Sequence, residues 1–336
     1  MKQLVLLFSA ALLATASFAQ EQTPQQTART FMMAGDFDNA VLVLTRALQS
    51  DKGNLEMQKD LALSFYYKRD YAKALDVVKM LMDNDQADVA SYQVAGNVYK
   101  ALEEVKDAEK VYKKGIKKFP NSGALYSEYG ELLWAKKDAG AIDQWEKGIR
   151  LDPSYAGNYY NAALHYYYGK DKTWSLIYGE IFINMESLTE RATMMKDLLL
   201  SGYKEKLFAD ADMLANQEKK TTTDFAKAFL ETMSKQSSLL SRGMNVDVLT
   251  MIRTRFILDW SKTYAAKFPF KLFDYQQQLI REGMFDAYNQ WLFSTTQNLP
   301  AYETWSKTHA EAFAKFNTFQ RSRIFKIPTG QYYGEQ

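Results

Sequence analysis

The chain has 336 residues, of which 47% are hydrophobic and 14% aromatic, enough to bury a sizeable core. Its 42 Lys and Arg residues nearly balance 40 Asp and Glu residues, which argues against nucleic acid as a partner, because such binding needs a strongly basic surface. The absence of cysteine excludes disulfides and thiolate metal sites.

The first 19 residues, MKQLVLLFSAALLATASFA, have a lysine, an apolar run, and small residues at Ser17 and Ala19. This pattern predicts a secretory signal peptide cleaved near Ala19, and we prefer it to the alternative of a buried N-terminal helix. No later segment supplies the roughly 20 apolar residues that a transmembrane helix needs. Without cysteine, a bacterial lipid anchor is not expected either. We therefore predict an exported protein, located in the periplasm of a Gram-negative bacterium.

A small residue recurs along the first half of the chain at spacings of 34, 34 and 33 residues, at Ala40, Ala74, Ala108 and Ala141. This period is typical of a helix-turn-helix repeat. Pro120 and Pro153 follow two of the predicted second helices and are 33 residues apart. Because proline cannot continue a helix, each marks the end of a repeat.

The pattern resembles the tetratricopeptide repeat, which carries small residues at positions 8, 20 and 27 and proline at position 32. Positions 8 and 20 are small throughout, whereas Leu81 and Phe182 depart from the pattern at position 27. The resemblance implies an all-α superhelix of helix pairs over residues 20–187, followed by an all-helical extension. We place the five repeats, of which the last is degenerate, at 21–54, 55–88, 89–122, 123–155 and 156–188.

The second half keeps helical periodicity but loses the repeat, and no stretch alternates as a strand does. Gly283, Phe285 and Pro300 match repeat positions, so we hypothesise a cryptic repeat at 269–302, although Gln276, Tyr288 and Thr295 stand where small residues are expected. The C-terminal helical domain spans 188–323, and 324–336 is a tail. The helices of the C-terminal domain are predicted at 188–215, 222–240, 245–267, 271–282, 285–297 and 301–323.

Catalytic chemistry has no candidate residue in this sequence. His165 and His309 belong to no recognised metal or catalytic motif, and a partly buried histidine is the simpler interpretation of each. No phosphate-binding loop, dinucleotide fingerprint or nucleophile elbow is present. We therefore predict no enzyme activity, no cofactor and no metal.

The resemblance implies that a peptide binds the inner surface formed by the first helix of each repeat. The family's carboxylate clamp is not carried over, because Leu63 rather than Asn follows Lys59 at the required position. Two interpretations stay open: the tyrosines of this surface face a partner, or the C-terminal helices bury Tyr167 and Tyr168. The predicted groove-lining residues are Arg29, Lys59, Tyr66, Tyr67, Gln93, Asn97, Lys100, Glu131, Trp134, Tyr160, Tyr167 and Tyr168.

The sequence thus favours a non-enzymatic scaffold that binds another polypeptide of unknown identity. It resembles uncharacterised secreted tetratricopeptide proteins of Bacteroidetes, firmly over 21–175 and loosely beyond. The alternative is a glycan-binding repeat protein, because exposed aromatic rings also stack on sugars. A hydrolase with paired carboxylates in the C-terminal half is the third and least favoured interpretation.

Overall fold

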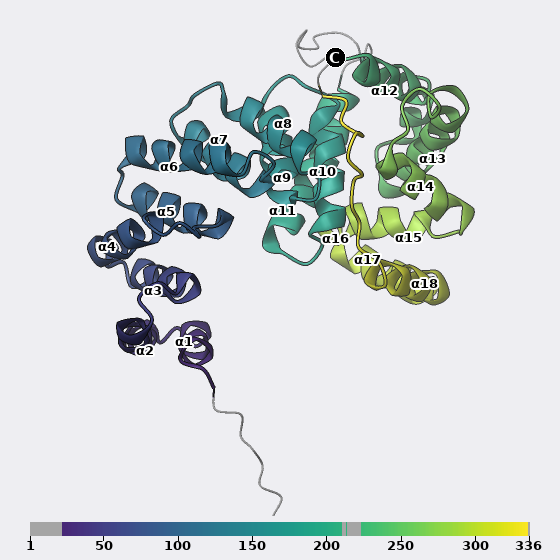
Figure 1. Cartoon of the computed structure of the whole chain (residues 1–336). Helices are drawn as coiled ribbons and strands as arrows, with labels where there is room; N and C mark the ends of the chain where they lie inside the picture. Colours follow the sequence, from purple (N-terminus) through teal and green to yellow (C-terminus); the bar gives the residue numbers. More distant parts are fainter. Residues whose placement is uncertain (1–21, 210–212, 214–222, 335–336) are drawn as a thin grey trace, which may run out of the picture. The chain divides into compact units, whose positions relative to one another are not determined.

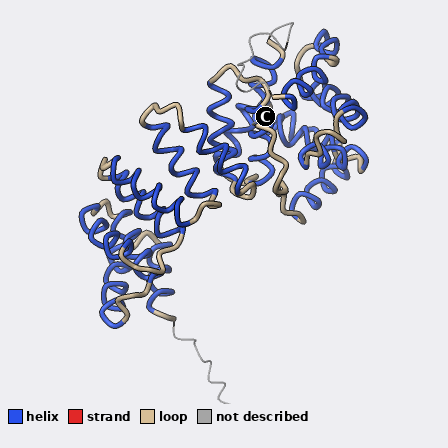
Figure 2. Tube along the Cα trace, turned by 45° about the horizontal axis from the view of Figure 1, so that its top comes forward, coloured by secondary structure: helices blue, strands red, loops and turns tan. Residues whose placement is uncertain are grey.

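The structure is a computed structural model, and it describes residues 22–209, 213 and 223–334. The predicted signal peptide lies outside the described residues. Within them every regular element is a helix, as Figure 2 shows. The predicted all-α fold is thereby confirmed. The chain folds into two compact units, one ending at Ala87 and the other beginning at Asp88.

The first unit consists of two helix pairs. Its helices begin after side chains that accept a hydrogen bond from the first turn, at Thr23, Asp36, Asn54 and Asp70. The first helices of the two pairs pack against each other. The pairs are α1 (Pro24–Met33) with α2 (Phe37–Ser50), and α3 (Leu55–Tyr67) with α4 (Tyr71–Met82).

The second unit begins with three further pairs, stacked along the chain in Figure 1. Each predicted repeat range contains one of them. The first helices again form a row, since α5 packs on α7 and α7 on α9. The pairs are α5 (Val89–Ala101) with α6 (Val105–Lys118), α7 (Gly123–Ala135) with α8 (Ala141–Leu151), and α9 (Ala156–Tyr168) with α10 (Trp174–Met185).

The small residues of the repeat make room for aromatic rings from the second helix of the same pair. A Cβ atom added at Gly96 would lie 2.2 Å from the ring of Tyr112, and one at Gly130 would lie 2.3 Å from the indole of Trp145. In these two repeats the close neighbour of the small residue is a buried aromatic side chain, so the small and the aromatic positions depend on each other.

The turn inside each of the first four repeats has one backbone geometry. The second residue of each turn has positive φ, at Gly35, Arg69, Glu103 and Lys137. In each, this residue and the next donate N–H bonds to carbonyls three and five residues back, which is the Schellman cap of a helix C-terminus. The turn spans 34–36, 68–70 and 102–104 in the first three repeats but 136–140 in the fourth, which is two residues longer.

The C-terminal helices depart from the predicted ranges in several places. The α-helix expected over 188–215 ends at Ser201 and is followed by a π-helix, and the one expected over 222–240 ends at Ser234 and is followed by a 3-10 helix. The helix expected over 301–323 is broken at His309, and the one expected over 285–297 contains a π-helical segment. The elements are α11 (Glu190–Ser201), the π-helix η1 (Gly202–Leu207), α12 (Asp224–Ser234), the 3-10 helix η2 (Ser237–Arg242), α13 (Val246–Thr263), α14 (Lys271–Arg281), α15 (Phe285–Asn289), the π-helix η3 (Gln290–Ser294), α16 (Thr295–Gln297), α17 (Leu299–Thr308) and α18 (Ala310–Arg321).

Gly283, in the turn between α14 and α15, has φ 70° and the same pair of cap bonds as the turns of the repeats. The cryptic repeat at 269–302 stays a prediction, since a cap of this kind ends many helices outside repeats.

Helix α10 joins the repeats to the C-terminal helices. All its residues from Trp174 to Asn184 are buried, because α9 covers one face and α11 another. The junction predicted at 187/188 therefore lies inside the second unit. The predicted tail also packs here: Phe325 and Ile327 are buried, and Tyr333 stacks on Phe225 with 4.8 Å between ring centroids. Its extended course is the yellow segment in Figure 1.

Candidate functional site

The candidate binding surface of the second unit is the row of first helices α5, α7 and α9. Eight of the predicted residues lie on these helices, and polar bridges join one helix to the next. Lys100 Nζ lies 2.7 Å from Glu128 Oε2, which links α5 to α7. Asn161 on α9 donates to Glu131 Oε1 on α7 at 3.0 Å. The bridges hold the three helices in one register. Gln93, Asn97 and Lys100 lie on α5, Glu131 and Trp134 on α7, and Tyr160, Tyr167 and Tyr168 on α9.

On this surface, the carboxyl group of Glu131 has a pKa above its usual value. Its side chain reaches solvent, but neighbouring groups surround the carboxyl, and this desolvation raises its pKa. The charge of Glu128 acts in the same direction, and the hydrogen bond from Asn161 opposes it. The surface thus holds an acidic group that takes up a proton more readily than an ordinary glutamate.

The tyrosines of α9 differ in how far the C-terminal helices cover them. Tyr160 packs against Phe182, and the guanidinium of Arg191 on α11 lies 5.1 Å from its ring centroid. Tyr167 is half-buried under Lys206, whose Nζ lies 5.0 Å from the ring. Tyr168 is 70% exposed. The α9 surface is therefore partly covered near α11 and open at Tyr168.

An open pocket of about 480 Å³ lies beside Trp134, at the long turn 136–140. Trp134 is 46% exposed, and its ring rests on the rings of Trp145 and His165 at centroid distances of 5.8 and 5.4 Å. Trp145 is buried and donates from Nε1 to the carbonyl of Ser127 at 3.2 Å. The other residues lining the pocket are Ala135, Lys137, Asp138 and Ala139.

In the first unit the predicted cations are already engaged. Arg29 donates to Asp60 at 2.8 Å and to Glu56 at 3.0 Å, and these contacts raise its pKa. Lys59 is only 6% exposed and forms an ion pair with Glu56. It was predicted to line the groove, but burial leaves its ammonium little access to a partner.

The two tyrosines predicted for the first unit lie at the end of α3. The ring of Tyr67 is exposed and stacks on Phe37 with 5.3 Å between centroids. Tyr66 is half-buried and packs against Tyr71. An exposed aromatic ring thus lies beside the turn of the second repeat, as Trp134 lies beside that of the fourth.

Residues 26–89 match the family model of the tetratricopeptide repeat. This range covers most of the first predicted repeat and all of the second. A comparison with curated proteins found no match.

A comparison with solved structures found several that are similar to about half of this chain. A crystal structure of MamA is 19% identical with a TM-score of 0.38, covering 53% of this chain and 95% of that one. MamA 41-end from Desulfovibrio magneticus RS-1 is 15% identical with a TM-score of 0.40, covering 50% and 95%. YrrB, described as a TPR protein with an unusual peptide-binding site, is 19% identical with a TM-score of 0.37, covering 52% and 90%.

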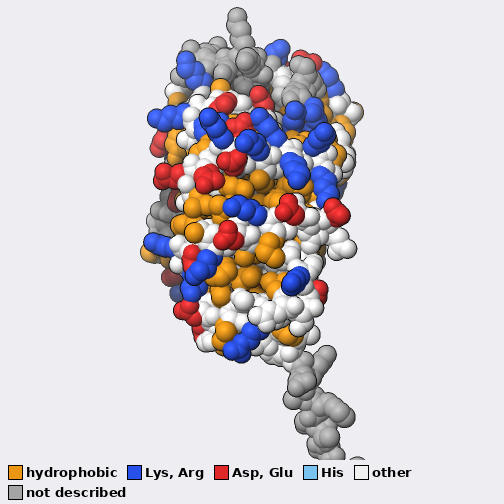
Figure 3. Space-filling model, turned by 60° about the vertical axis from the view of Figure 1, so that its left-hand side comes forward, with side chains coloured by type: hydrophobic (Ala, Val, Ile, Leu, Met, Phe, Trp, Pro, Cys, Tyr) orange, Lys and Arg blue, Asp and Glu red, His pale blue; other side chains and the backbone are white. Residues whose placement is uncertain are grey.

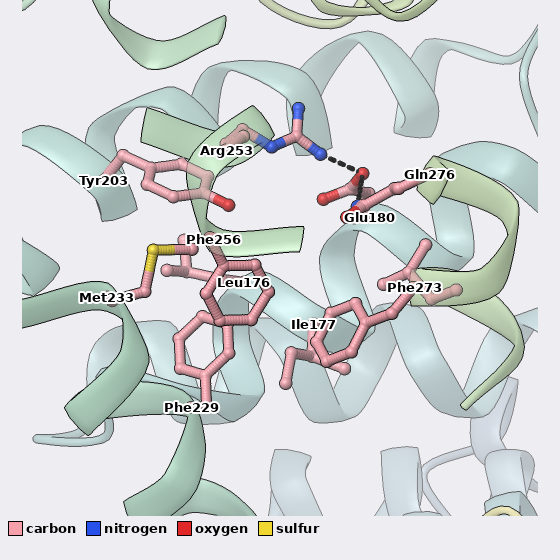
Figure 4. A pocket seen from close by; sticks show the side chains of 11 residues that line it. Leu176, Ile177, Glu180, Tyr203, Phe229, Met233, Arg253, Phe256, Phe273 and Gln276 are labelled. Atoms are coloured by element: carbon pink, nitrogen blue, oxygen red, sulfur yellow. Dashed lines mark hydrogen bonds and ion pairs between the residues drawn. The ribbon is translucent and has the colours of Figure 1, made fainter. Parts of the chain in front are cut away.

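A buried polar cluster, which sequence reasoning missed, lies between α10 and the C-terminal helices rather than on the row of first helices (Figure 4). Glu180 forms an ion pair with Arg253, and its Oε1 also accepts bonds from Gln276 at 2.6 Å and from the Tyr288 hydroxyl at 2.7 Å. The adjoining cavity measures about 10 Å³, the lower limit for one water. The cluster therefore joins helices and leaves no room for a substrate.

The histidines do not form a site together. His165 belongs to the Trp134 pocket, whereas His309 stacks on Trp305 with 4.9 Å between centroids. Among the residues that the structure describes, no group of three or more His, Asp or Glu could hold a metal ion. In the same residues, no helix has both the length and the apolar character needed to cross a bilayer.

Proposed function

We propose that the chain is a non-enzymatic scaffold that binds another polypeptide through the row of first helices α5, α7 and α9. The observation that carries the proposal is the openness of this surface: Trp134 and Tyr168 remain exposed, although C-terminal helices follow in the same unit. Large exposed aromatic side chains among amides and charges are typical of protein-binding surfaces.

The charge distribution supports the same proposal. Figure 3 shows one face of the molecule, on which basic and acidic side chains are interspersed around hydrophobic ones. A surface of this kind has no single-sign field that would attract a polyanion. A polypeptide, which offers apolar, amide and charged groups together, is the partner that fits best.

The proposal is tested by selecting peptides from a random display library on the chain from Gln20 onward. We expect enriched peptides whose affinity falls at least about tenfold in the double variant Asn97→Ala/Glu131→Ala, because both side chains lie on the proposed surface. The matched control is Lys110→Ala/Lys114→Ala on the second helix α6, which should bind as the unchanged chain does. No enrichment, or equal binding by the surface variant, would contradict the proposal.

We further propose that the chain is exported and cleaved after Ala19, because residues 1–19 have the pattern of a signal peptide. Expression of the full chain in a Gram-negative host should place a product beginning at Gln20 in the periplasmic fraction. N-terminal sequencing of that fraction is the measurement. A variant lacking residues 2–19 should stay in the cytoplasm, and an uncleaved cytoplasmic product from the full chain would contradict the proposal.

A further inference from the structure

Charged side chains of the proposed surface already have partners within the second unit. Lys100 pairs with Glu128 at 2.7 Å. Next to the surface, Arg191 on α11, which covers Tyr160, pairs with Glu186 at 2.7 Å. At the edge of the surface, Lys136 pairs with Glu109 at 2.9 Å. A charged partner would have to break these contacts before forming its own. Electrostatic attraction is therefore a weak source of affinity here, and an apolar contact gains relative importance.

The pocket beside Trp134 offers such an apolar contact. It lies where the turn 136–140, which is two residues longer than those of the first three repeats, faces His165 near the end of α9. The indole of Trp134 and the methyl groups of Ala135 and Ala139 form its apolar lining. Its volume of about 480 Å³ is within the range of ligand pockets, roughly 300–1,000 Å³.

The walls of the pocket are held in place before any ligand binds. The N–H groups of Lys137 and Asp138 donate to the carbonyls of Trp134 and Leu133, both at 2.9 Å. Asp138 Oδ1 accepts a bond from the Gly140 N–H at 2.8 Å, which fixes the rest of the turn. Buried Trp145 supports the Trp134 ring from the side. Binding therefore requires little ordering of the protein, which favours affinity.

The chemistry of the pocket selects an uncharged, apolar occupant. Its two ionic residues, Lys137 and Asp138, are adjacent and of opposite sign, so they give no net charge that would favour a cation or an anion. Tyr168 lies three residues after His165 on the same side of α9 and adds an exposed aromatic surface nearby. Bulky apolar side chains inserted into such preformed pockets are the usual anchors of protein interfaces.

We propose that this pocket, defined by Trp134, Ala135, Ala139 and His165, receives a bulky apolar side chain of the partner polypeptide as the main anchor of the complex. This inference rests on the proposed function, because it assigns the anchoring contact of that same surface. The paired charges around it then select orientation rather than supply affinity.

The test uses the chain from Gln20 onward with ¹⁵N-labelled tryptophan, in which Trp134→Phe identifies the Trp134 indole resonance. We expect N-acetylphenylalanine amide to shift this resonance in a saturable way, and N-acetyllysine amide and methyl α-glucopyranoside to leave it unchanged. Ala139→Glu, which places a charged side chain in the pocket, should abolish the shift. Ala72→Glu, the same change at an exposed position on α4, should not.

Library-selected peptides separate this inference from the function on which it rests. Trp134→Ala and Ala139→Glu should each weaken their binding at least about tenfold. If the peptides bind Ala139→Glu as tightly as the unchanged chain, the scaffold stands and the anchoring pocket is wrong. A shift caused by the glucoside but not by the phenylalanine amide would overturn the inference in favour of a sugar site, and no shift with any probe would also overturn it.

Discussion

At the scale of single residues, Glu180 carries the largest predicted effect on stability. It is buried and neutralises Arg253, which is buried as well. Glu180→Gln keeps the shape but leaves the guanidinium without its counter-charge, so we expect the free energy of unfolding to fall by about 3–5 kcal/mol. Chemical denaturation measures it. The control is Asp107→Asn, which removes the exposed pair of Asp107 with Lys110 and should cost less than about 1 kcal/mol. Equal effects would contradict the account.

The buried Lys196 on α11 should make the stability of the protein depend on pH. Its Nζ donates to the carbonyl of Trp291 at 2.9 Å and lies 3.9 Å from the indole centroid, and burial lowers its pKa to about 7. In the unfolded chain the pKa is about 10.4. Between these values the unfolded state binds more protons, so this lysine makes the protein more stable as pH rises from about 7 to about 10.

The variant Lys196→Met removes this titration. Relative to the unchanged chain, we expect it to be most stable at pH 6, where the buried charge costs most, and to lose more than half of that advantage by pH 9, because the cost of burying Lys196 declines until about pH 10. Urea denaturation at the two pH values gives the comparison. Lys110→Met, at an exposed site, should show no such change with pH. A Lys196→Met difference that is the same at both pH values would refute the assignment.

These residues show what the sequence could not reveal. Glu180 and Arg253 are 73 positions apart in the sequence. The hydrophobic pattern of the two helices does not identify either of these charged residues as buried. A charged residue is normally assigned to the solvent-facing side of a helix, so only the packing of distant helices identifies the pair. Trp134, in contrast, was predicted to lie on the binding surface. Its pocket was missed because it depends on the conformation of the turn 136–140.

At the scale of elements, the turns with positive φ give a matched pair of substitutions. Gly283 has φ 70° with open space around its Cβ position, so Gly283→Ala should cost about 1 kcal/mol through backbone strain alone. Glu103 occupies the same geometry with a side chain, and Glu103→Gly should therefore stabilise by up to about 1 kcal/mol. Thermal unfolding of both variants checks the opposite signs. Gly53→Ala, where φ is not positive, should have the smaller effect.

The C-terminal segment offers a second element-scale prediction, with two isoleucines three positions apart. Ile327 is buried, so Ile327→Ala should lower the free energy of unfolding by about 2–5 kcal/mol. Ile324 is 84% exposed, and Ile324→Ala should change it by less than about 0.5 kcal/mol. Denaturant titration of the two variants is the measurement. Equal small effects would mean that the segment does not contribute to the core.

Helix boundaries were predictable where proline, glycine or the repeat period marks them. The five helix pairs fall within the five predicted repeat ranges for this reason. The break at His309 has neither a proline nor a glycine near it, and the π-helical turns at 202–207 and 290–294 arise within continuous helical patterns. Such local changes follow from tertiary packing, which periodicity alone does not encode.

At the scale of the whole molecule, the fold class followed from one local rule: small residues at a fixed period allow helix pairs to stack. The rule holds in both units, at Ala40 and Ala74 in the first and at Ala108 and Ala141 in the second, all of them buried. It says nothing of the C-terminal helices, whose contacts with α10 join positions about 70–110 residues apart. The architecture of that region therefore had to come from the structure.

We expect the two units to fold differently when each is made as a separate fragment. Residues 88–336 contain the buried Glu180 cluster, the tail contacts and a core with Trp174 and Trp260 among its largest side chains. We expect this fragment to be helical by circular dichroism and to unfold in one cooperative transition. Residues 22–87 hold only two helix pairs, fewer than the three repeats that a stable stack usually needs, and so should be weakly helical alone.

Introducing Ile327→Ala into the larger fragment makes the comparison sharper. If the fragment has the native core, its transition should shift by as much as that of the full chain, because the side chain lies within the same compact unit. A fragment that melts without a cooperative transition, or that is insensitive to Ile327→Ala, would show that the second unit needs the first two repeats in order to fold. In that case the stacked helices, rather than the C-terminal core, would supply the cooperativity of the whole chain.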